Sequence, residues 1–441
     1  MAESNSSSWV NKHIVPVAGK ISQFRPLIAI RDGLTLALPL IIIGSFFTIL
    51  ASFPITAWTN FISKTVINNV SISAVFAKIS NGSFGIMGLV AAFGVAQSYA
   101  SQKKVDGTSA GILSAAAFFI VTPSITSSGK TVLEGMPYKY LGSNGLFVAI
   151  IIGLISASIY HWFIAHHIEI KMPDSVPPAV AKSFSALLPG AAIILFAGAV
   201  YALFSWAGWG NIHEVFINLL YKPLSMLSDT LWGTLISIFL LCAFWFVGIH
   251  GASIVNTALN PMWLMQTDAN RVLYQAHHLD LAHGGHIIDY TFINNFVYMG
   301  GGGATLGLVI SIGILVMIKK ANPQYKVLAP LTIIPGLFNI NEPVIFGLPV
   351  VLNFTILIPF ILVPMVNAVT TYIAMATGLV PLCTGTVIPW TMPPIISGFL
   401  ATNSWLGSAL QVINIIIDTA IYFPFVAAIN RQELAKTQME A

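Results

Sequence analysis

The chain has 441 residues, of which 56% are hydrophobic and only 8% are charged, and its formal net charge is +4. A soluble domain carries about a quarter charged residues, so this sequence has too few polar side chains to cover a water-facing surface, which excludes a soluble globular protein. The basic residues lie between apolar runs and form no stripe. This arrangement is typical of cytoplasmic loops in a membrane protein and not of a surface that binds nucleic acid.

Residues 1–32 predict an amphipathic N-terminal segment on the membrane surface. After a polar start, lysine and arginine alternate with apolar side chains, which is the pattern of a helix that lies in the membrane interface. No signal peptide is expected before the first span.

Apolar runs of about 20 residues can cross the hydrocarbon core of a bilayer. We expect spans at residues 33–53, 84–100, 109–125, 145–166, 184–206, 230–247, 303–318, 351–376 and 406–428. The stretches 251–302, 327–350 and 379–402 are also apolar, but Gly, Pro and Asn interrupt them. Broken backbone is tolerated at membrane depth only where it packs in protein or lines a wet cavity, so these stretches predict re-entrant hairpins around a site.

The distribution of these breaks suggests two halves. Residues 33–229 form an N-terminal membrane half with few interruptions, residues 230–430 form a C-terminal half in which breakers accumulate, and residues 431–441 form a tail. The join is expected at 171–183 or at 209–228, and one continuous bundle is the alternative. The positive-inside rule places the basic clusters, and with them both chain termini, in the cytoplasm.

The segment WFVGIHG contains the first candidate for chemistry. His250 is the only histidine in an uncharged tract from Leu231 to Gln266. An ionisable side chain at membrane depth is costly and usually faces the interior of the bundle, and Gly251 beside it lets a backbone or ligand approach closely. We expect either a functional histidine or one that is satisfied by a helix carbonyl.

The segment FNINEPVIFG contains the second candidate. Glu342 is the only charged residue between Lys326 and Asp418, and a glutamate facing lipid would carry a large penalty. Pro343 disfavours helical geometry in the residues before it. The pattern predicts a carboxylate on an unwound tip, with Asn341 placed to contact a ligand. An interhelical ion pair is the alternative, although this tract offers no cation.

Two tryptophans lie close to these features. Trp390 lies between prolines in TGTVIPWTMPP, and Trp245 precedes His250. A flat aromatic face can stack on the apolar edge of a sugar ring, and the alternative for both is the aromatic belt at the membrane interface.

Other features predict no additional chemistry. The histidine-rich stretch 277–286 fits no zinc spacing, so no metal and no cofactor is expected. Cys242 and Cys383 lie inside apolar runs, where cysteine acts as a small hydrophobe. The chain has no GxxxxGK[ST] loop and therefore does not itself hydrolyse ATP.

Several segments resemble a known family over nearly the whole chain. They are FRPLIAIRDGLTLALPLIIIGSFF near the N-terminus, GIHGA at 248–252, FVYMGGGGATLGLVI at 296–310, LFNINEPVIFGLPVVLN at 337–353, and the region of Trp390. These segments resemble the lactose/cellobiose-type membrane component, enzyme IIC, of the bacterial sugar phosphotransferase system.

The resemblance implies an all-α polytopic membrane protein with about ten transmembrane helices, re-entrant hairpins and an N-terminal surface helix. It implies a homodimer joined through the N-terminal halves and surrounded by lipid in the bacterial cytoplasmic membrane. The C-terminal half would carry a disaccharide across the membrane like an elevator. A separate IIB subunit would then phosphorylate the sugar's 6-hydroxyl from a phosphocysteine.

The resemblance also assigns site residues. The catalytic histidine and glutamate of the family fall on His250 and Glu342, where a carboxylate beside an imidazole can take the hydroxyl proton. The expected substrate-binding residues are Trp245, Gly251, Asn341, Trp390 and, in LGSNGLF at 141–147, Asn144.

The sequence therefore predicts the membrane translocator of a phosphotransferase system for a disaccharide such as cellobiose, lactose or chitobiose. The resemblance implies that it would be the membrane subunit of a sugar phosphotransferase, with the phosphoryl-carrying cysteine on its partner. One alternative is a proton- or ion-coupled sugar symporter that uses Glu342 as its proton site. A passive receptor or channel is another, and it would form no phosphorylated product.

Overall fold

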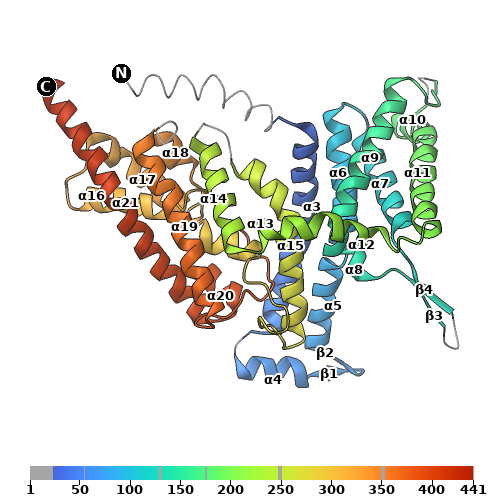
Figure 1. The fold of residues 1–441 in the computed structure, drawn as a ribbon, viewed down its shortest axis with the longest axis horizontal. Coiled ribbons are helices and arrows are strands. Elements are labelled where there is room, and N and C mark those ends of the chain that lie inside the picture. The colour runs from blue at the N-terminus through green and yellow to red at the C-terminus, as the bar shows by residue number, and fades with distance from the viewer. Residues whose placement is uncertain are drawn as a thin grey trace. The chain divides into compact units, whose positions relative to one another are not determined.

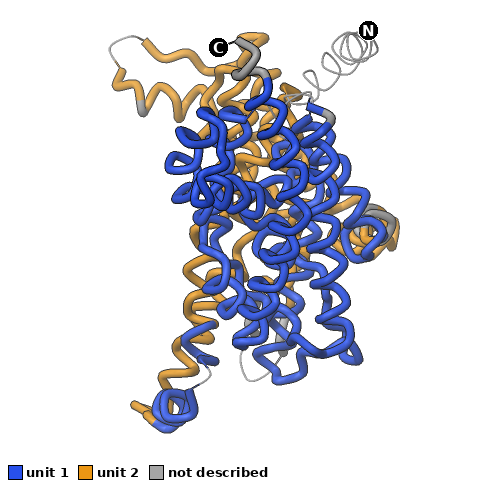
Figure 2. Tube along the Cα trace, turned by 90° about the vertical axis from the view of Figure 1, so that its left-hand side faces the viewer, with its two compact units in different colours: residues 1–22, 49–64, 226–441 blue, residues 23–48, 65–225 orange. Residues whose placement is uncertain are grey.

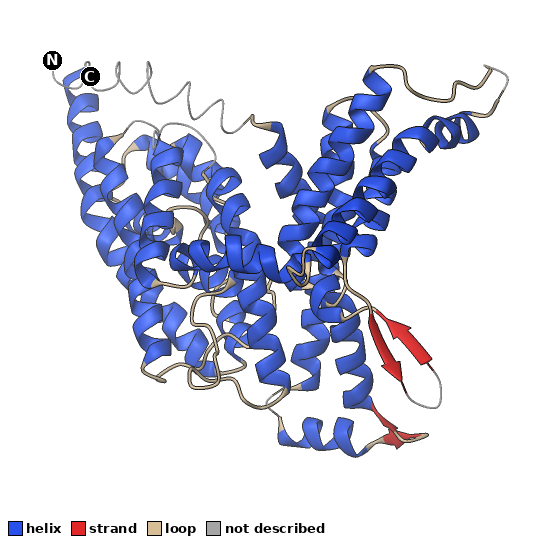
Figure 3. Cartoon of the chain, turned by 45° about the vertical axis from the view of Figure 1, so that its right-hand side comes forward, coloured by secondary structure: helices blue, strands red, loops and turns tan. Residues whose placement is uncertain are grey.

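The computed structural model describes residues 23–53, 55–128, 132–173, 176–246, 251–348 and 353–440. Two expectations lie wholly or partly outside these residues, namely residues 1–22 of the surface segment expected at 1–32 and the candidate His250. The described residues 25–32 of that segment belong to the apolar helix Arg25–Ala51, which is long enough to cross a membrane. Helices make up most of the described chain (Figures 1 and 3). The expectation of an all-α polytopic membrane protein is confirmed in this respect, apart from two short strand pairs.

The first part of the described chain contains the elements α3 (Arg25–Ala51), α4 (Thr56–Lys64), β1 (Val66–Ile67), β2 (Val70–Ser71), α5 (Ile72–Phe84), α6 (Met87–Gln102), α7 (Gly107–Val121), β3 (Ile125–Ser128), β4 (Val132–Gly135), α8 (Tyr138–Leu141), η2 (Ser143–Gly145), α9 (Leu146–Ala165), α10 (Pro178–Ser185), α11 (Leu187–Trp206), α12 (Ile212–Phe216) and η3 (Ile217–Tyr221). The second part contains α13 (Lys222–Ser228), α14 (Leu231–Phe246), α15 (Ala252–Gln275), η4 (Phe292–Val297), α16 (Leu306–Met317), α17 (Pro323–Leu337), α18 (Glu342–Gly347), α19 (Phe354–Ala376), α20 (Ile396–Thr402) and α21 (Trp405–Glu440).

Within the described residues, six helical stretches are long and apolar enough to cross a membrane. They are Arg25–Ala51, Ile72–Gln102, Ser143–Ala165, Leu187–Trp206, Thr355–Ala376 and Trp405–Ala435. Shorter apolar helices cover Gly107–Val121, Leu231–Phe246 and Leu306–Met317. These helices lie close to the spans expected from the apolar runs.

Local signals in the sequence explain where several of these helices begin. Asp106 caps α7 by accepting a hydrogen bond from the backbone N–H of Thr108. Asn322 caps α17 in the same way, and Pro323 follows it at a position where the missing N–H costs nothing. These two helices therefore begin at residues whose side chains pair an otherwise unpaired N–H group of the first turn.

The two strand pairs were not expected from the sequence. Strands β1 and β2 pair antiparallel with Ile67 opposite Val70. The two linking residues, Asn68 and Asn69, have φ angles of 48° and 64°, which is the left-handed geometry of a two-residue hairpin turn that asparagine tolerates. The two consecutive asparagines were the sequence signal from which this hairpin turn could have been predicted. Strands β3 and β4 form the second antiparallel hairpin.

The described chain divides into two compact units, coloured separately in Figure 2. Unit 1 contains described residues of 49–64 and 226–440, and unit 2 contains residues 23–48 and those described of 65–225. Residues 49–64 group with the C-terminal part because Asn403 donates a side-chain hydrogen bond to the carbonyl of Ser52, and Phe53 meets Phe399 edge to face. The sequence-based division at 229/230 did not anticipate this crossing of the chain.

Unit 2 is a bundle in which α6 packs against α7 and α9, and α11 packs against the same pair. Small residues allow its helices to approach closely. Where α3 crosses α6, a Cβ on Gly33 would lie 2.4 Å from the backbone nitrogen of Val95, and a Cβ on Gly94 would lie 2.9 Å from the Cα of Gly33. Close backbone packing of this kind is typical of helices in membranes.

Unit 1 is built around α19, which packs against α14, α21 and η4, while α16 packs against α17 and α21. The structure corrects the expectation for residues 251–302, because α15 is one continuous helix from Ala252 to Gln275 with Pro261 inside it. The irregular backbone begins only after α15. In 327–350 the break between α17 and α18 is short, and in 379–402 non-helical chain leads into α20.

Candidate functional site

A run of glycines, Gly300 to Gly303, forms the centre of the candidate site in unit 1 and is called the glycine loop below. It lies between η4 and α16. Gly300, Gly301 and Gly303 have φ angles of 85°, 94° and 83°, a region that only glycine enters readily. A Cβ on Gly300 would lie 2.1 Å from the backbone nitrogen of Leu306, so the loop could not fold this way with larger residues.

Side chains in the core of unit 1 hold the glycine loop in place. The hydroxyl of Tyr422, on α21, donates a 2.6 Å hydrogen bond to the carbonyl of Gly303. The ring of Phe360, on α19, would lie 2.2 Å from a Cβ on Gly303, and the backbone carbonyl of Phe360 accepts a hydrogen bond from Cys242 Sγ on α14. Three helices therefore fix the position of the loop.

The four residues Phe338–Asn341, called the asparagine tip below, join α17 to α18 and lie against the glycine loop. Asn341 donates from Nδ2 to the carbonyl of Gly302 at 2.8 Å. Asn339 accepts at Oδ1 from the backbone N–H of Gly300 at 2.6 Å. Both asparagines are buried, with 5% and 4% of their surface exposed, so the two bonds are shielded from competing water.

Glu342 follows directly, and the structure refines its predicted geometry. The unwound tip ends at Asn341, and Glu342 is the first residue of the short helix α18, with Pro343 after it. Its side chain is exposed in the structure. A carboxylate at this position is accessible to a ligand and lies at the end of a tip whose backbone is fixed by buried hydrogen bonds.

Residues 389–393, called the tryptophan segment below, lie on the other side of Asn339. The amide nitrogen of Asn339 donates to the carbonyls of Trp390 and Met392 at 2.6 and 3.0 Å. The segment turns at this point, because the N–H of Met392 bonds the carbonyl of Pro389 at 2.9 Å. The side chain of Trp390 remains 48% exposed, which leaves a ring face free for stacking while its backbone is held.

Trp245 reaches the same place from the end of α14. It is buried, with 5% of its surface exposed, and a Cβ on Gly302 would lie 2.8 Å from its Nε1. Gly251 is the N-cap of α15, and a Cβ there would lie 2.1 Å from the carbonyl oxygen of Leu241 on α14. The structure thus brings Trp245, Asn341 and Trp390 around one glycine loop, although they come from distant parts of the sequence.

Two predicted residues do not belong to the described part of unit 1. His250 lies outside the described residues. Asn144 belongs to unit 2, where it is half-buried in the turn η2 that leads into α9. Both remain predictions made from the sequence.

Two histidines of the stretch 277–286 lie within hydrogen-bond distance of a carboxylate. His286 pairs through Nδ1 with Asp229 at 3.0 Å, and His283 pairs with Asp280 at 2.8 Å. The hydrogen bond from His283 holds the pKa of Asp280 below its usual range. His283 and His286 therefore each have a carboxylate partner.

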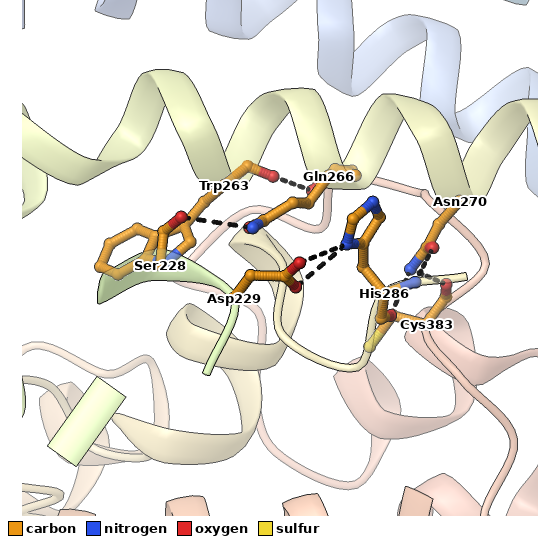
Figure 4. A network of polar contacts seen from close by, with 8 residues as sticks. Ser228, Asp229, Trp263, Gln266, Asn270, His286 and Cys383 are labelled. Atoms are coloured by element: carbon orange, nitrogen blue, oxygen red, sulfur yellow. Dashed lines mark hydrogen bonds and ion pairs between the residues drawn. The ribbon is translucent and has the colours of Figure 1, made fainter. Parts of the chain in front are cut away.

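A polar network shown in Figure 4 joins this stretch to the chain that precedes the tryptophan segment. Asn270, on α15, donates to the carbonyls of His286 and Cys383 at 2.8 and 3.2 Å and accepts from the N–H of His286 at 2.8 Å. Thr291 donates to the carbonyl of Thr386 at 2.7 Å. Side-chain hydrogen bonds thus pair backbone N–H and C=O groups that have no helical partner in this non-helical chain. Such pairing is required where water is excluded.

Sequence reasoning missed the role of two groups in this site. The glycine loop was noticed only as part of a resemblance, although four consecutive glycines are a strong signal for unusual backbone geometry. Asn339 was seen as part of a polar tip, but its bonds to the tryptophan segment join residues 51 and 53 positions apart. A contact at that separation has no local signature.

The arrangement offers the parts of a sugar site, namely an exposed carboxylate, an accessible aromatic face and a rigid polar frame. A profile of the family described as "Phosphotransferase system, EIIC" matches residues 31–364. The chain is similar to the lichenan permease IIC component of Bacillus subtilis, with 42% identity over 96% of this chain and 94% of that protein. It is also similar to the cellobiose-specific EIIC component of Geobacillus stearothermophilus, with 41% identity over 97% of this chain and 95% of that protein.

A solved structure is similar over the same length. It is the crystal structure of the transporter ChbC, the IIC component from the N,N'-diacetylchitobiose-specific phosphotransferase system. The sequence identity is 38%, the TM-score is 0.90, and the match covers 98% of this chain and 100% of that chain.

Proposed function

This chain belongs to the EIIC family of the phosphotransferase system, and on that premise we propose that it binds a β-linked disaccharide of the cellobiose type and carries it inward for phosphorylation. The first support is that the similar proteins are named for lichenan, cellobiose and N,N'-diacetylchitobiose. These names share β-linked sugar units, and lactose remains a further candidate from the sequence.

The observation that carries the proposal is the joining of the asparagine tip, the glycine loop and the tryptophan segment by buried hydrogen bonds. Within this frame, the ring of Trp390 stacks on a sugar face, and Trp245 and Asn341 complete the wall beside it. Gly251 allows the chain around His250 to approach the sugar. Asn144 is a further sugar contact by resemblance.

Glu342 and His250 have the catalytic role in this proposal. A partner IIB subunit supplies the phosphoryl group from a phosphocysteine. The bond between sulfur and phosphorus breaks, a bond forms between phosphorus and the sugar's 6-oxygen, and the hydroxyl proton passes to the carboxylate of Glu342, with His250 assisting. The two cysteines of this chain are fully buried, which fits a donor thiolate on the partner.

The proposal extends to the assembly of the protein. The chain acts as a homodimer in the bacterial cytoplasmic membrane, with the N-terminal half forming the dimer contact, the C-terminal half moving the sugar, and both termini in the cytoplasm. One support for the orientation is that Asn430 donates to the carbonyl of Lys320 at 2.8 Å. The basic residues Lys319, Lys320 and Arg431 therefore lie at one end of unit 1, as the positive-inside rule requires of a cytoplasmic end.

The decisive experiment uses inverted membrane vesicles that contain the full chain, supplied with phosphoenolpyruvate, the soluble phosphotransferase proteins and labelled cellobiose. The wild-type protein should form cellobiose phosphate, and Glu342→Gln should abolish this product while the purified variant stays folded and monodisperse. Phosphorylation at the normal rate by Glu342→Gln would refute the catalytic role of Glu342.

The same vesicles separate the proposal from a symporter. Dissipating the proton gradient should leave phosphoenolpyruvate-driven formation of the product unchanged. A proton-coupled symporter would stop accumulating sugar at once under this treatment, and a passive channel would give no phosphorylated sugar at all.

A further inference from the structure

One buried side chain, that of Asn339, joins three segments that are far apart in the sequence. Its Oδ1 accepts from Gly300 N–H in the glycine loop, and its Nδ2 donates to the carbonyls of Trp390 and Met392 in the tryptophan segment. Asn339 itself lies in the asparagine tip. The acceptor and both amide protons are thus in use, so a single residue connects the tip, the loop and the segment.

The partners also determine the orientation of the amide. One partner is a backbone N–H and the other two are carbonyl oxygens, so a flipped amide would place like groups against each other at all three contacts. The backbone of Asn339 has a φ angle of 62°, which asparagine and glycine tolerate better than other residues. Asparagine therefore suits this position both by its side-chain amide and by its tolerance of a left-handed backbone.

The position of Trp390 depends directly on this amide. Trp390 has a half-exposed side chain, so packing around the ring alone does not hold it. The chain that follows the tryptophan segment is anchored by Gln411 on α21, whose Oε1 accepts from the N–H groups of Ile395 and Gly398. Asn339 bonds the segment at Trp390 itself. Asn339 lies two residues before Asn341 and three residues before Glu342.

We infer that Asn339 is a positioning residue for sugar binding, which holds the ring of Trp390 in register with Asn341 and Glu342. Asn339 is 4% exposed and acts through Trp390 without contacting the sugar. The inference rests on the proposed function, since it assumes that Trp390 stacks on the sugar. Stacking contributes equally before and during phosphoryl transfer, so its loss raises KM and leaves kcat nearly unchanged.

The test is a double-mutant cycle in the full chain, with Asn339→Gly, Trp390→Ala and the double variant. Glycine removes the amide and keeps the left-handed backbone. We expect each single variant to weaken cellobiose binding at least about tenfold and the double variant to be no more than about threefold weaker than Trp390→Ala alone. In the vesicle assay, KM for cellobiose should rise by a similar factor for Asn339→Gly while kcat stays within about threefold.

Asn339→Asp provides a second variant in case the glycine variant is poorly folded. Aspartate keeps the acceptor for Gly300 N–H and tolerates the same backbone, but its carboxylate cannot donate to the carbonyls of Trp390 and Met392. The same non-additivity with Trp390→Ala is expected. A matched control is Asn430→Ala, which removes an asparagine that also accepts from a backbone N–H and donates to a carbonyl, at Asn322 and Lys320.

Three results would overturn the inference. These are fully multiplicative losses in the double variant, a fall in kcat with an unchanged KM, or an equal loss of affinity in Asn430→Ala. Failure of the proposed function itself would look different, because the wild-type protein would then bind no β-linked disaccharide and form no sugar phosphate.

Discussion

Asn341 donates a 2.8 Å hydrogen bond to the carbonyl oxygen of Gly302, from a side chain that is 5% exposed. This bond holds the residue before Glu342 against the glycine loop, on the side where Trp245 lies. The backbone that carries Glu342 is thus held in place, although the Glu342 side chain is exposed. A backbone held in place reduces the conformational entropy that is lost when a catalytic side chain is positioned against its substrate.

Replacing Asn341 by aspartate should weaken sugar binding. The carboxylate cannot donate to the Gly302 carbonyl, and it places a buried negative charge beside a carbonyl oxygen. We expect cellobiose affinity, measured by calorimetry on the purified protein, to fall at least about tenfold, or about 1.4 kcal/mol. Asn353→Asp is the matched control, because Asn353 accepts from the N–H groups of Thr355 and Ile356 at the start of α19, and aspartate caps equally well. Equal affinity in wild type and Asn341→Asp would contradict the prediction.

Replacing Gly303 by alanine should destabilise unit 1. The new Cβ would lie 2.2 Å from the ring of Phe360, and the φ angle of 83° disfavours any side chain. We expect a loss of about 2–5 kcal/mol from strain and overpacking, visible as a lower unfolding temperature in detergent. Gly313→Ala, on α16, is the control, because its Cβ would meet Ile333 at an ordinary 3.8 Å. That variant should be as stable as wild type or more so, and an equal loss in both variants would count against the packing argument.

Removing both cysteines should leave phosphorylating uptake intact. Cys242 and Cys383 have no exposed surface, and a buried thiol is a poor nucleophile. The double variant Cys242→Ala/Cys383→Ala should form cellobiose phosphate within about threefold of the wild-type rate when the soluble phosphotransferase proteins are supplied. Small truncations of buried side chains lower the free energy of unfolding by about 1–2 kcal/mol, and they leave the rate of phosphoryl transfer unchanged when the side chain takes no part in it. A variant that binds sugar normally but forms no product would show that this chain carries the phosphoryl group itself.

His213 should make the stability of unit 2 depend on pH. Its ring stacks on Tyr140 at 4.9 Å, its Nε2 lies 3.0 Å from Thr122 Oγ1, and burial lowers its pKa from 6.5 to about 4. Between pH 6.5 and 4 the unfolded chain binds a proton that the folded chain does not, so stability falls as the pH falls through this window. The loss attributable to His213 is about 3 kcal/mol.

The measurement is the unfolding temperature of the purified protein at pH 7 and at pH 5. His213→Gln keeps a polar group near Thr122 and cannot titrate, so its unfolding temperature should fall less between the two pH values than that of the wild type. An identical fall in both proteins would show that other groups determine the acid response.

The sequence by itself determined the class of protein and most of its spans. An apolar run at membrane depth indicates a helix, because a single segment can pair all its backbone N–H and C=O groups without water only as a helix. The runs at 145–166 and 184–206 accordingly match α9 and α11 closely. The same physical rule marked Glu342 as a residue that must avoid lipid. The motif around it carried the resemblance to the phosphotransferase family, which the comparisons confirm.

Only the tertiary structure decided how the broken stretches fit together. Asn339 and Trp390 are 51 positions apart, and the partner of Gly303 on α21 is 119 positions away. Hydrogen bonds over such separations depend on how helices pack and leave no periodic trace in the sequence. Likewise, residues 49–64 group with unit 1, where Ser52 and Phe53 contact Asn403 and Phe399. The helix α15 continues through Pro261, although proline removes a backbone hydrogen bond from a helix.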